Sequence, residues 1–406
     1  SVHLKRSIKM ARSPIPAFHT LLTPCLAILL FVSAPCAIAQ TVAQESSSDD
    51  QQGIELYAGM EFEHSDNIFG LMDSQQSKME AGATEDLKSG RFNDMESISD
   101  NIVSPLFGVI YSFKGLDGED LNLSARMRYN YYMENQEKSY PETRICLKND
   151  IGKKGALVLQ GDFLFDFFNK NYLTGYDDEN ENGNISRDER IYSPAIYDEY
   201  EASLAYEHEI FKDRGQALSQ VEVKPFFGYS IRAYNSPFDN RGRQSTFIGV
   251  ELALEFVSRI DLELVYQFEN NRYPGDDELV LYDETGAEID VNNDGEIGAN
   301  APLVTPVDRS AYRHTLEINP SIKISKELQF YLGYEERTSD YTSDNPLDID
   351  HFEKTLCRQR VKAGIAYDFS KSWSAEIEYR QTDDEGDDGI DYSENRFTFL
   401  IKYDLP

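Results

Sequence analysis

Residues 120–133 read DLNLSARMRYNYYM, and apolar and polar side chains alternate along this stretch. Successive side chains of a β-strand point to opposite faces, so the pattern predicts a strand with one apolar and one polar face. The apolar face carries Leu121, Leu123, Ala125, Met127, Tyr129 and Tyr131. The polar face carries Asn122, Ser124, Arg126, Arg128 and Asn130. Such a strand suits a boundary between an apolar phase and water.

The same period of two recurs along most of the chain. GIELYAGMEFEH at 53–64 opens the series, and we predict fourteen strands in all. Most of them have the roughly 9 to 11 residues that a tilted strand needs to cross a bilayer. Besides 53–64 and 120–133, the predicted strands lie near 103–113, 142–151, 156–167, 199–209, 219–233, 246–257, 261–270, 311–324, 328–337, 354–369, 373–381 and 395–405.

The connections between these strands alternate in length. Short links are expected at 114–119, 152–154, 210–217, 258–260, 325–327 and 370–372. Long polar insertions are expected at about 65–100, 168–195, 234–245, 271–310, 338–352 and 382–394, with one short exception near 134–139. Short turns on one side, long loops on the other and an even strand number predict an all-β transmembrane antiparallel up-and-down barrel, with short periplasmic turns and long extracellular loops. The alternative is a large soluble β-protein with one solvated face on each sheet.

Charge and hydropathy narrow the class of protein further. The 406 residues carry a formal net charge of −33, which disfavours nucleic acid as a partner and attracts cations. The mean hydropathy is −0.53, and no apolar run reaches the 18 residues of a membrane-spanning helix. A barrel remains compatible with this composition, because its strands turn only half of their residues toward lipid.

The start of the chain predicts export. Residues 1–39 combine a basic segment, the apolar run LLTPCLAILLFVS and the sequence Ala37-Ile38-Ala39, which are the three regions of a secretory signal peptide. A polar segment, QTVAQESSSDDQQG, follows. We therefore expect a signal peptide at 1–39, a polar periplasmic leader at 40–52 and an outer-membrane barrel at 53–406.

The polar faces of the strands would line the lumen of this barrel. A barrel of fourteen strands is too wide for side chains to fill, so water or an inserted loop must occupy it. The segment 65–100 either folds inward as a constriction or stands outside as a lid. Cross-strand charge pairs either brace the wall or select a conducted solute. The predicted lumen-lining charges are Arg126, Arg128, Arg144, Lys148, Glu201, Glu251, Glu263, Arg358, Arg360, Glu376, Glu378 and Lys402.

Two further patterns concern the walls. The acidic pair Glu376 and Glu378 lies between two basic strands, so we expect it to form cross-strand ion pairs. Glu55, Glu61 and Glu63 of the first strand are expected to meet the last strand where the barrel closes.

Residues 178–189 read DENENGNISRDE, which has the spacing of an EF-hand calcium loop. The flanks are aromatic and alternating, so the two helices of an EF-hand are missing and the loop must be mounted on a strand connection. The expected ligands are Asp178, Asn180, Asn182, Asn184, Ser186 and Glu189. We expect Ca²⁺ to stiffen this extracellular loop without a signalling role.

Two other acidic stretches are weaker candidates for calcium. The segment 290–301 offers Asp290, Asn292 and Asp294, but Ala301 stands where the bidentate glutamate should be. The run DDEGDDGIDYSE at 383–394 fits the spacing poorly and predicts a solvated acidic loop.

The stretch GMEFEHSDNIF at 59–69 opens the first strand and leads into its loop. In this stretch the chain resembles the β-barrel porins of Gram-negative outer membranes, some of which are associated with exopolysaccharide export. The resemblance implies an outer-membrane location, contact with lipid, insertion by the barrel-assembly machinery and passage of a small solute or saccharide. The chain ends in YDLP where such barrels have a terminal aromatic, although the alternation Phe397, Phe399, Ile401, Tyr403, Leu405 is kept.

The remaining residues give little support for catalysis. No HExxH, GxSxG or nucleotide-binding loop occurs, and His314 shares the parity of Leu316 and Ile318, which predicts a membrane-interface position. Cys146 and Cys357 lie on strands that are not neighbours, so we expect free thiols. Two functions stay open: a channel or porin for small hydrophilic solutes or saccharides, and a non-conducting surface barrel whose calcium-stiffened loops bind a partner or a cell-surface glycan.

Overall fold

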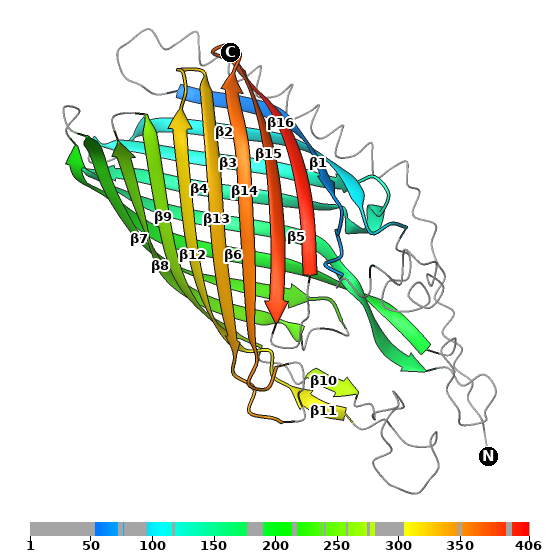
Figure 1. Ribbon diagram of the computed structural model, residues 1–406. Helices are drawn as coiled ribbons and strands as arrows, with labels where there is room; N and C mark the ends of the chain where they lie inside the picture. The colour runs from blue at the N-terminus through cyan, green and yellow to red at the C-terminus, as the bar shows by residue number, and fades with distance from the viewer. Residues whose placement is uncertain are drawn as a thin grey trace, which may run out of the picture. The chain divides into compact units, whose positions relative to one another are not determined.

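Fourteen antiparallel strands close into one barrel in the computed structural model (Figure 1), which confirms the predicted fold class. The structure describes residues 53–71, 76, 96–115, 118–176, 190–212, 217–236, 238, 241–256, 259–273, 277–280, 304–346, 348, 351–386 and 392–405. The barrel strands are β1 (Gly53–Ser65), β2 (Asp100–Lys114), β3 (Asp120–Tyr132), β4 (Tyr140–Ile151), β5 (Gly155–Tyr176), β6 (Arg190–Lys212), β7 (Leu218–Tyr234), β8 (Arg243–Phe256), β9 (Ile260–Arg272), β12 (Ala311–Lys323), β13 (Leu328–Tyr341), β14 (Thr355–Asp368), β15 (Trp373–Gly386) and β16 (Tyr392–Leu405).

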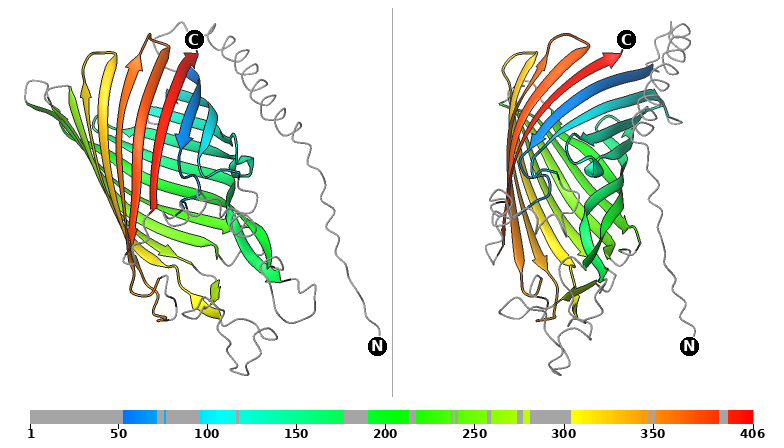
Figure 2. Two further views of the ribbon diagram at one scale, coloured as in Figure 1. Left: turned by 45° about the vertical axis from the view of Figure 1, so that its right-hand side comes forward. Right: turned by 90° about the vertical axis from the view of Figure 1, so that its right-hand side faces the viewer.

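Each barrel strand pairs with the strand before and after it, and β1 pairs with β16 to close the cylinder. In this seam Met60 faces Ile401 and Ser65 faces Arg396. Figure 2 shows the first and last strands side by side. Two short strands, β10 (Asp277–Val280) and β11 (Val304–Val307), form a separate hairpin within the expected insertion 271–310. Their four residues each are too few for a period of two to be recognised in the sequence.

The connections follow the predicted alternation. Six links of at most five residues join β2 to β3, β4 to β5, β6 to β7, β8 to β9, β12 to β13 and β14 to β15. The opposite end holds the longer connections and the predicted short exception, residues 133–139, which contain the 3-10 turn η1 (Gln136–Lys138). It also holds a second short link of five residues between β15 and β16, where a long insertion at 382–394 was expected. We refer to the end with the long connections as the mouth of the barrel. Among the described residues, no helix has the length and hydropathy needed to cross a bilayer.

The predicted loop at 168–195 is wrong at both of its ends, because β5 continues to Tyr176 and β6 begins at Arg190. They pair with each other from Gly155 and His208 as far as Tyr176 and Arg190, beyond the reach of their outer neighbours β4 and β7. Register shifts between Leu164 and Phe167 interrupt the alternation, and Asp166 has a positive φ of 54°. Such a bulge reverses the inward and outward parity of the residues that follow it. The sequence pattern therefore stops at 167, although the strand does not.

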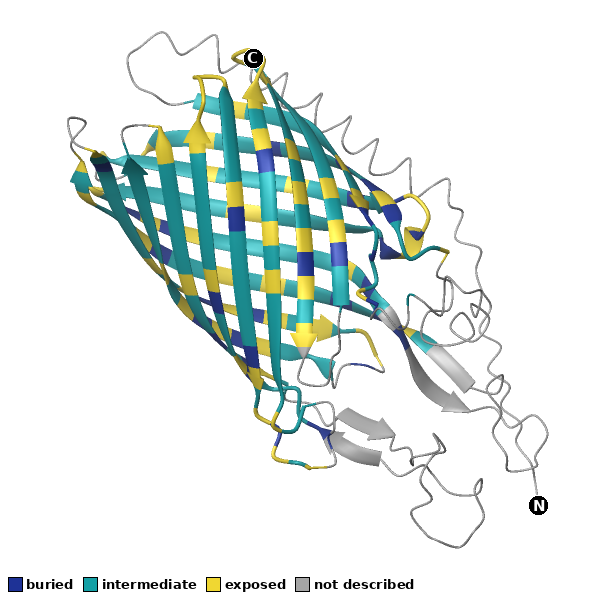
Figure 3. Ribbon diagram, viewed as in Figure 1, coloured by how far each residue is buried: buried dark blue, intermediate teal, exposed yellow. Residues whose placement is uncertain are grey.

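The outer surface of the barrel is apolar. Exposed and less exposed positions alternate along the described strands (Figure 3), and the exposed ones include Phe227, Ile248, Val361 and Phe397. The polar residues between them face inward. Large apolar side chains avoid water, so an outer face that exposes many of them requires an apolar surrounding.

Aromatic residues lie at both ends of the outer face. Trp373, which follows a short turn, packs at 4.7 Å between ring centroids against Tyr403. Toward the mouth, the Oη atom of Tyr266 lies 2.9 Å from Nδ1 of His314, and Tyr312 is exposed nearby on the same strand. These positions fit an aromatic girdle at the two lipid headgroup layers, and they confirm the expected outward orientation of His314.

Candidate functional site: the barrel lumen

The structure places the twelve predicted lumen-lining residues on the parity opposite to the exposed apolar side chains. Arg126 and Arg128 flank the exposed Met127, and Glu376 and Glu378 flank the exposed Ile377. The same relation holds for the other eight: Arg144, Lys148, Glu201, Glu251, Glu263, Arg358, Arg360 and Lys402.

Most of these charges form ion pairs across the wall. Arg128 lies 2.9 Å from Glu61 and 2.9 Å from Glu142, so one guanidinium joins β1, β3 and β4. Arg360 contacts Glu335 at 2.7 Å. Further pairs are Arg144 with Asp162, Lys148 with Glu207, Lys224 with Glu207 and Glu251, Arg358 with Asp384, and Lys402 with Asp404. Apart from Lys402 and Asp404, which both lie on β16, these pairs link different strands and brace the wall.

Glu376 and Glu378 depart from the prediction. Instead of pairing with the basic strands beside them, both accept hydrogen bonds from the hydroxyl of Tyr331 on β13. The register explains the difference. Glu378 faces Gly364 and Thr398, and Glu376 faces Ala366 and Leu400, so no cation stands directly opposite either carboxylate.

The seam between β1 and β16 is held by polar contacts near the mouth. Glu63 lies 3.1 Å from Arg396, as expected for a charge of the first strand at the closing seam, whereas Glu61 binds Arg128 of β3 instead. Ser65 donates a hydrogen bond to Glu394. The carboxylate of Asp66 accepts from the backbone N–H of Asn395 at 2.7 Å and from its side-chain amide at 2.8 Å.

The prediction that residues 383–394 form a solvated acidic loop is wrong for the residues at both ends of this run. Asp384 lies in β15 and is paired with Arg358, and Glu394 lies in β16 with only 7% of its surface exposed. Both strands extend further toward the mouth than their alternation indicates. These carboxylates therefore point into the lumen.

The motif that carries the family resemblance forms a compact turn at the end of the seam that lies at the mouth. The side-chain amide of Asn67 donates to the backbone carbonyls of Leu71 and Ser393, each at 2.9 Å, and its Oδ1 accepts from the N–H of Leu71 at 2.8 Å. Gly70 has a φ of +62°, which glycine adopts readily. The buried Asn67 and Leu71 thus fasten the start of the first loop to the last strand.

A second polar cluster fastens the end of the same loop. The buried carboxylate of Asp100 accepts from the backbone N–H groups of Met133, Glu134 and Asn135, with a shortest distance of 2.7 Å. Asn135 in turn accepts from the N–H of Glu96 at 2.9 Å through its Oδ1. Both ends of the segment 65–100 are therefore fixed at the mouth, while residues 72–75 and 77–95 between them lie outside the described residues.

Lys138 of η1 is an interior cation that the sequence did not indicate. Its side chain is 4% exposed, and its Nζ lies 4.6 Å from the centroid of the Phe69 ring and 5.2 Å from that of Phe167. Burial lowers the pKa of this ammonium to about 8. Attraction by the two ring faces offsets part of the cost of burial. A single lysine in a polar link carries no sequence signal, because its burial depends on distant aromatics.

The pKa of Lys138 predicts a pH dependence of stability. Because the folded pKa of about 8 lies below the ordinary 10.5, the unfolded chain binds more protons between these values. Stability should therefore rise from pH 8 to pH 10.5, by on the order of 3 kcal/mol. The measurement is the unfolding free energy of the parent protein minus that of Lys138→Met across this range. A difference that does not change with pH would contradict the assignment.

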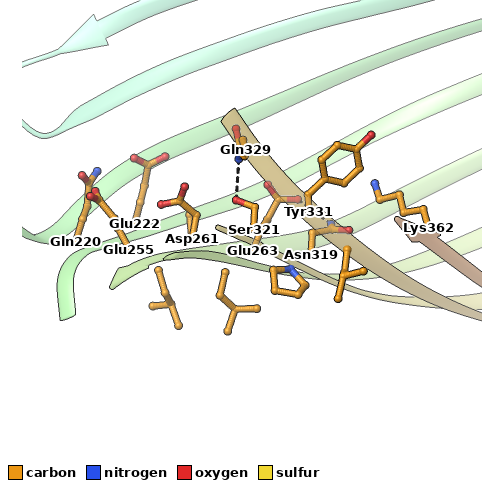
Figure 4. Close-up of a pocket in the computed structure, with 15 residues that line it drawn as sticks. Gln220, Glu222, Glu255, Asp261, Glu263, Asn319, Ser321, Gln329, Tyr331 and Lys362 are labelled. Atoms are coloured by element: carbon orange, nitrogen blue, oxygen red, sulfur yellow. Dashed lines mark hydrogen bonds between the residues drawn. The ribbon is translucent and has the colours of Figure 1, made fainter. Parts of the chain in front are cut away.

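A cavity of about 490 Å³ lies in the lumen against β7, β8, β9 and β12 to β14 (Figure 4). Its acidic residues are Glu222, Glu255, Asp261 and Glu263. Its other polar side chains are Gln220, Asn319, Ser321, Gln329, Tyr331 and Lys362. A smaller cavity of about 170 Å³ shares Asn319 and Lys362 with the first and adds Arg360, Glu378 and Arg380. The lumen wall thus offers both acidic and basic groups to a small polar solute.

The predicted calcium ligands lie outside the described residues. These are Asp178, Asn180, Asn182, Asn184, Ser186 and Glu189 of the first loop and Asp290, Asn292 and Asp294 of the second. Among the residues that the structure describes, no group of three or more His, Cys, Asp or Glu side chains is arranged to hold a metal ion. Cys146 on β4 and Cys357 on β14 are free cysteines.

No family model and no curated protein matches this sequence. Similar solved structures include the outer membrane channel DcaP of Acinetobacter baumannii, at 11% identity and a TM-score of 0.43 over 88% of this chain and 99% of that chain. A deltaS2 mutant of the TodX monoaromatic hydrocarbon channel is 10% identical, with a TM-score of 0.44 over 88% and 91%. An anion-selective porin from Comamonas acidovorans is 8% identical, with a TM-score of 0.38 over 87% and 100%. These three structures are described as channels or a porin, and the fold of this chain is a closed up-and-down barrel of fourteen antiparallel strands.

Proposed function

We propose that this chain is an outer-membrane channel whose lumen conducts small hydrophilic solutes. One observation carries the proposal: apolar side chains cover the outside of a closed barrel, while charged side chains and a cavity of about 490 Å³ lie inside. An apolar exterior suits lipid, and a polar interior suits water and dissolved solutes.

The finer parts of the proposal concern the regions outside the described residues. We propose that residues 1–39 direct export, that 40–52 form a periplasmic leader, and that the barrel-assembly machinery inserts the strands from Gly53 onward. The loop at 178–189 joins β5 to β6, so it would stand at the end of their long hairpin. Calcium bound there, and more weakly at 290–301, would stiffen the extracellular loops.

Single-channel recording tests the channel and the calcium loops together. The purified protein is refolded, inserted into a planar bilayer and recorded first with Ca²⁺ and then with a chelator. We expect steady current steps, with altered gating or noise after chelation if Ca²⁺ orders the loops. A Glu189→Ala variant should show the chelated behaviour at all Ca²⁺ concentrations, because the bidentate ligand is lost.

A non-conducting surface barrel is the second candidate function. The hydrogen-bonded mouth favours it, because Asn67, Asp100 and Lys138 are all buried there. A folded, heat-modifiable barrel that passes no current under either condition would overturn the channel and support a role in binding a partner or glycan.

A further inference from the structure

One row of inward residues crosses eight strands and changes sign along its length. The pairs Glu222 with Ala253, Ala253 with Glu263 and Glu263 with Asn319 join β7, β8, β9 and β12. Asn319 and Gly333 follow as neighbours on β12 and β13, since Ile318 pairs with Tyr334 and Ser321 with Tyr331. Gly333 pairs with Lys362, Lys362 with Arg380, and Arg380 with Arg396. We call this series the graded row: Glu222, Ala253, Glu263, Asn319, Gly333, Lys362, Arg380 and Arg396.

The charges of the graded row are only partly neutralised. The side chains of Glu222 and Lys362 form no ion pair or hydrogen bond within the described part of the chain, and the only ion pair of the Arg380 side chain there is a long one, 3.9 Å to Glu63. In addition, Lys362 and Arg380 stand directly opposite each other, as do Arg380 and Arg396. Like charges directly opposite each other destabilise a sheet. Bracing of the wall, which accounts for the pair Arg360 and Glu335, does not account for this arrangement.

Small residues in the middle of the row make room for a solute and for the lysine. A Cβ atom at Gly333 would lie 2.2 Å from Cε of Lys362 and 2.9 Å from Oδ1 of Asn319. The stem of Lys362 therefore lies across β13 toward β12. Figure 4 shows Lys362, Asn319 and Glu263 projecting from the wall into the same space.

The acidic and basic ends of the row lie within reach of one small molecule. Glu263 on β9 and Lys362 on β14 are three strand spacings apart, or about 14 Å between backbones. Because the side chain of Lys362 extends over Gly333 toward β12, its ammonium group lies closer to the carboxylate of Glu263 than the backbone separation indicates. Both cavities are lined by Asn319 and Lys362, so the ammonium stands at their common border.

We propose that the graded row selects zwitterionic solutes of the size of an amino acid or a short peptide. The ammonium group of the solute faces Glu222 and Glu263, and its carboxylate faces Lys362 and Arg380. A solute with one sign of charge gains from one end of the row and is repelled by the other. This inference rests on the proposed channel function and names the class of solute.

Glycylglycine and two analogues of nearly equal size and different charge test the proposal. Proteoliposomes are mixed with isosmotic glycylglycine, which is zwitterionic, glycolylglycine, which carries a hydroxyl in place of the ammonium and is anionic, or glycylglycinamide, which is cationic, and the swelling rate is recorded. We expect glycylglycine to enter about fivefold faster than either of the others, the ratio that one lost charge contact of about 1 kcal/mol produces.

Variants assign this preference to the two ends of the row. Lys362→Met should slow glycylglycine and glycolylglycine while leaving glycylglycinamide unchanged or faster, and Glu263→Gln should slow glycylglycine and glycylglycinamide. Gly333→Ala keeps every charge but displaces the lysine, so it should resemble Lys362→Met. The control is Lys402→Met, because Lys402 faces the lumen, pairs with Asp404 and lines neither cavity.

The outcomes separate the inference from the function on which it rests. Equal swelling rates for the three solutes, in a barrel that conducts ions, would overturn the zwitterion preference and leave the channel standing. A change of ranking in Lys402→Met equal to that in Lys362→Met would also overturn it. A folded barrel that passes neither ions nor any of the three solutes would overturn the channel itself. Heat-modifiable migration shows that each variant is folded.

Discussion

Replacement of Ile248 by arginine is expected to lower the unfolding free energy of the lipid-embedded barrel by about 2 to 4 kcal/mol. Ile248 lies near the middle of β8 and is 62% exposed on the outer face. An arginine there must remain in hydrocarbon or stretch toward the headgroups, and either costs free energy. Denaturant titration of the protein in lipid vesicles measures the effect.

Gln267→Arg is the matched control for this experiment. Gln267 of β9 pairs with Gly249, the residue next to Ile248, but it points into the lumen. Water and the nearby carboxylates of the lumen can solvate its guanidinium, so we expect a change within about 0.5 kcal/mol. Equal destabilisation by the two variants would contradict the assignment of outer and inner faces. A larger effect of the lumen variant would point to the soluble β-protein instead.

Replacement of Asp100 by alanine is expected to loosen the mouth. Asp100 is 1% exposed and accepts hydrogen bonds from three successive backbone N–H groups, those of Met133, Glu134 and Asn135. Alanine removes the acceptor of the Glu134 and Asn135 N–H groups, whereas the N–H of Met133 keeps its bond to the carbonyl of Asn101 at 3.0 Å. We expect a cost of on the order of 3 kcal/mol for the local structure. Amide exchange at 133–135 should accelerate about a hundredfold, which mass spectrometry or NMR can follow.

Conductance provides a second readout for the Asp100 variant. If the fixed link 133–139 narrows the mouth, its release should increase the size of the current steps or their noise. Asp120→Ala is the control, because Asp120 pairs with Lys114 at a short turn on the opposite end and is well exposed. We expect no change in exchange at 133–135 for this control. Unchanged exchange in Asp100→Ala would mean that the carboxylate does not hold the link.

The barrel itself could be predicted from the sequence because its strands meet two solvents at once. Leu123 and Met127 must face an apolar surrounding while Arg126 and Arg128 face water, so the period of two is strict. The alternation is lost where a strand no longer has one face in an apolar surrounding and the other in water. Beyond Asp166, the long hairpin of β5 and β6 passes the ends of its neighbours, and its alternation is broken by a bulge.

The contacts at the mouth and in the lumen could be predicted only in part. Parity placed Glu263 on the inner face of its strand, but it gave no register between strands, so the graded row was not visible. Asp100 and Asn135 meet across 35 residues, and their roles depend on backbone N–H groups rather than on a recognisable motif. Asn67 lay within the stretch that resembles porins, although the sequence did not indicate what its side chain holds.

The closing seam also sets the order in which this barrel can be completed. β1 and β16 are separated by more than 300 residues, and Glu394, Asn395 and Arg396 hold β1 and the first loop from a position near the end of the chain. Contacts of such high contact order form late, because the entropy of closing a very long loop is lost before they form. The first strand must therefore keep a free edge until the last one arrives. A chain truncated before β16 would expose two unpaired edges, and we expect it to aggregate or to be degraded before it can span a membrane.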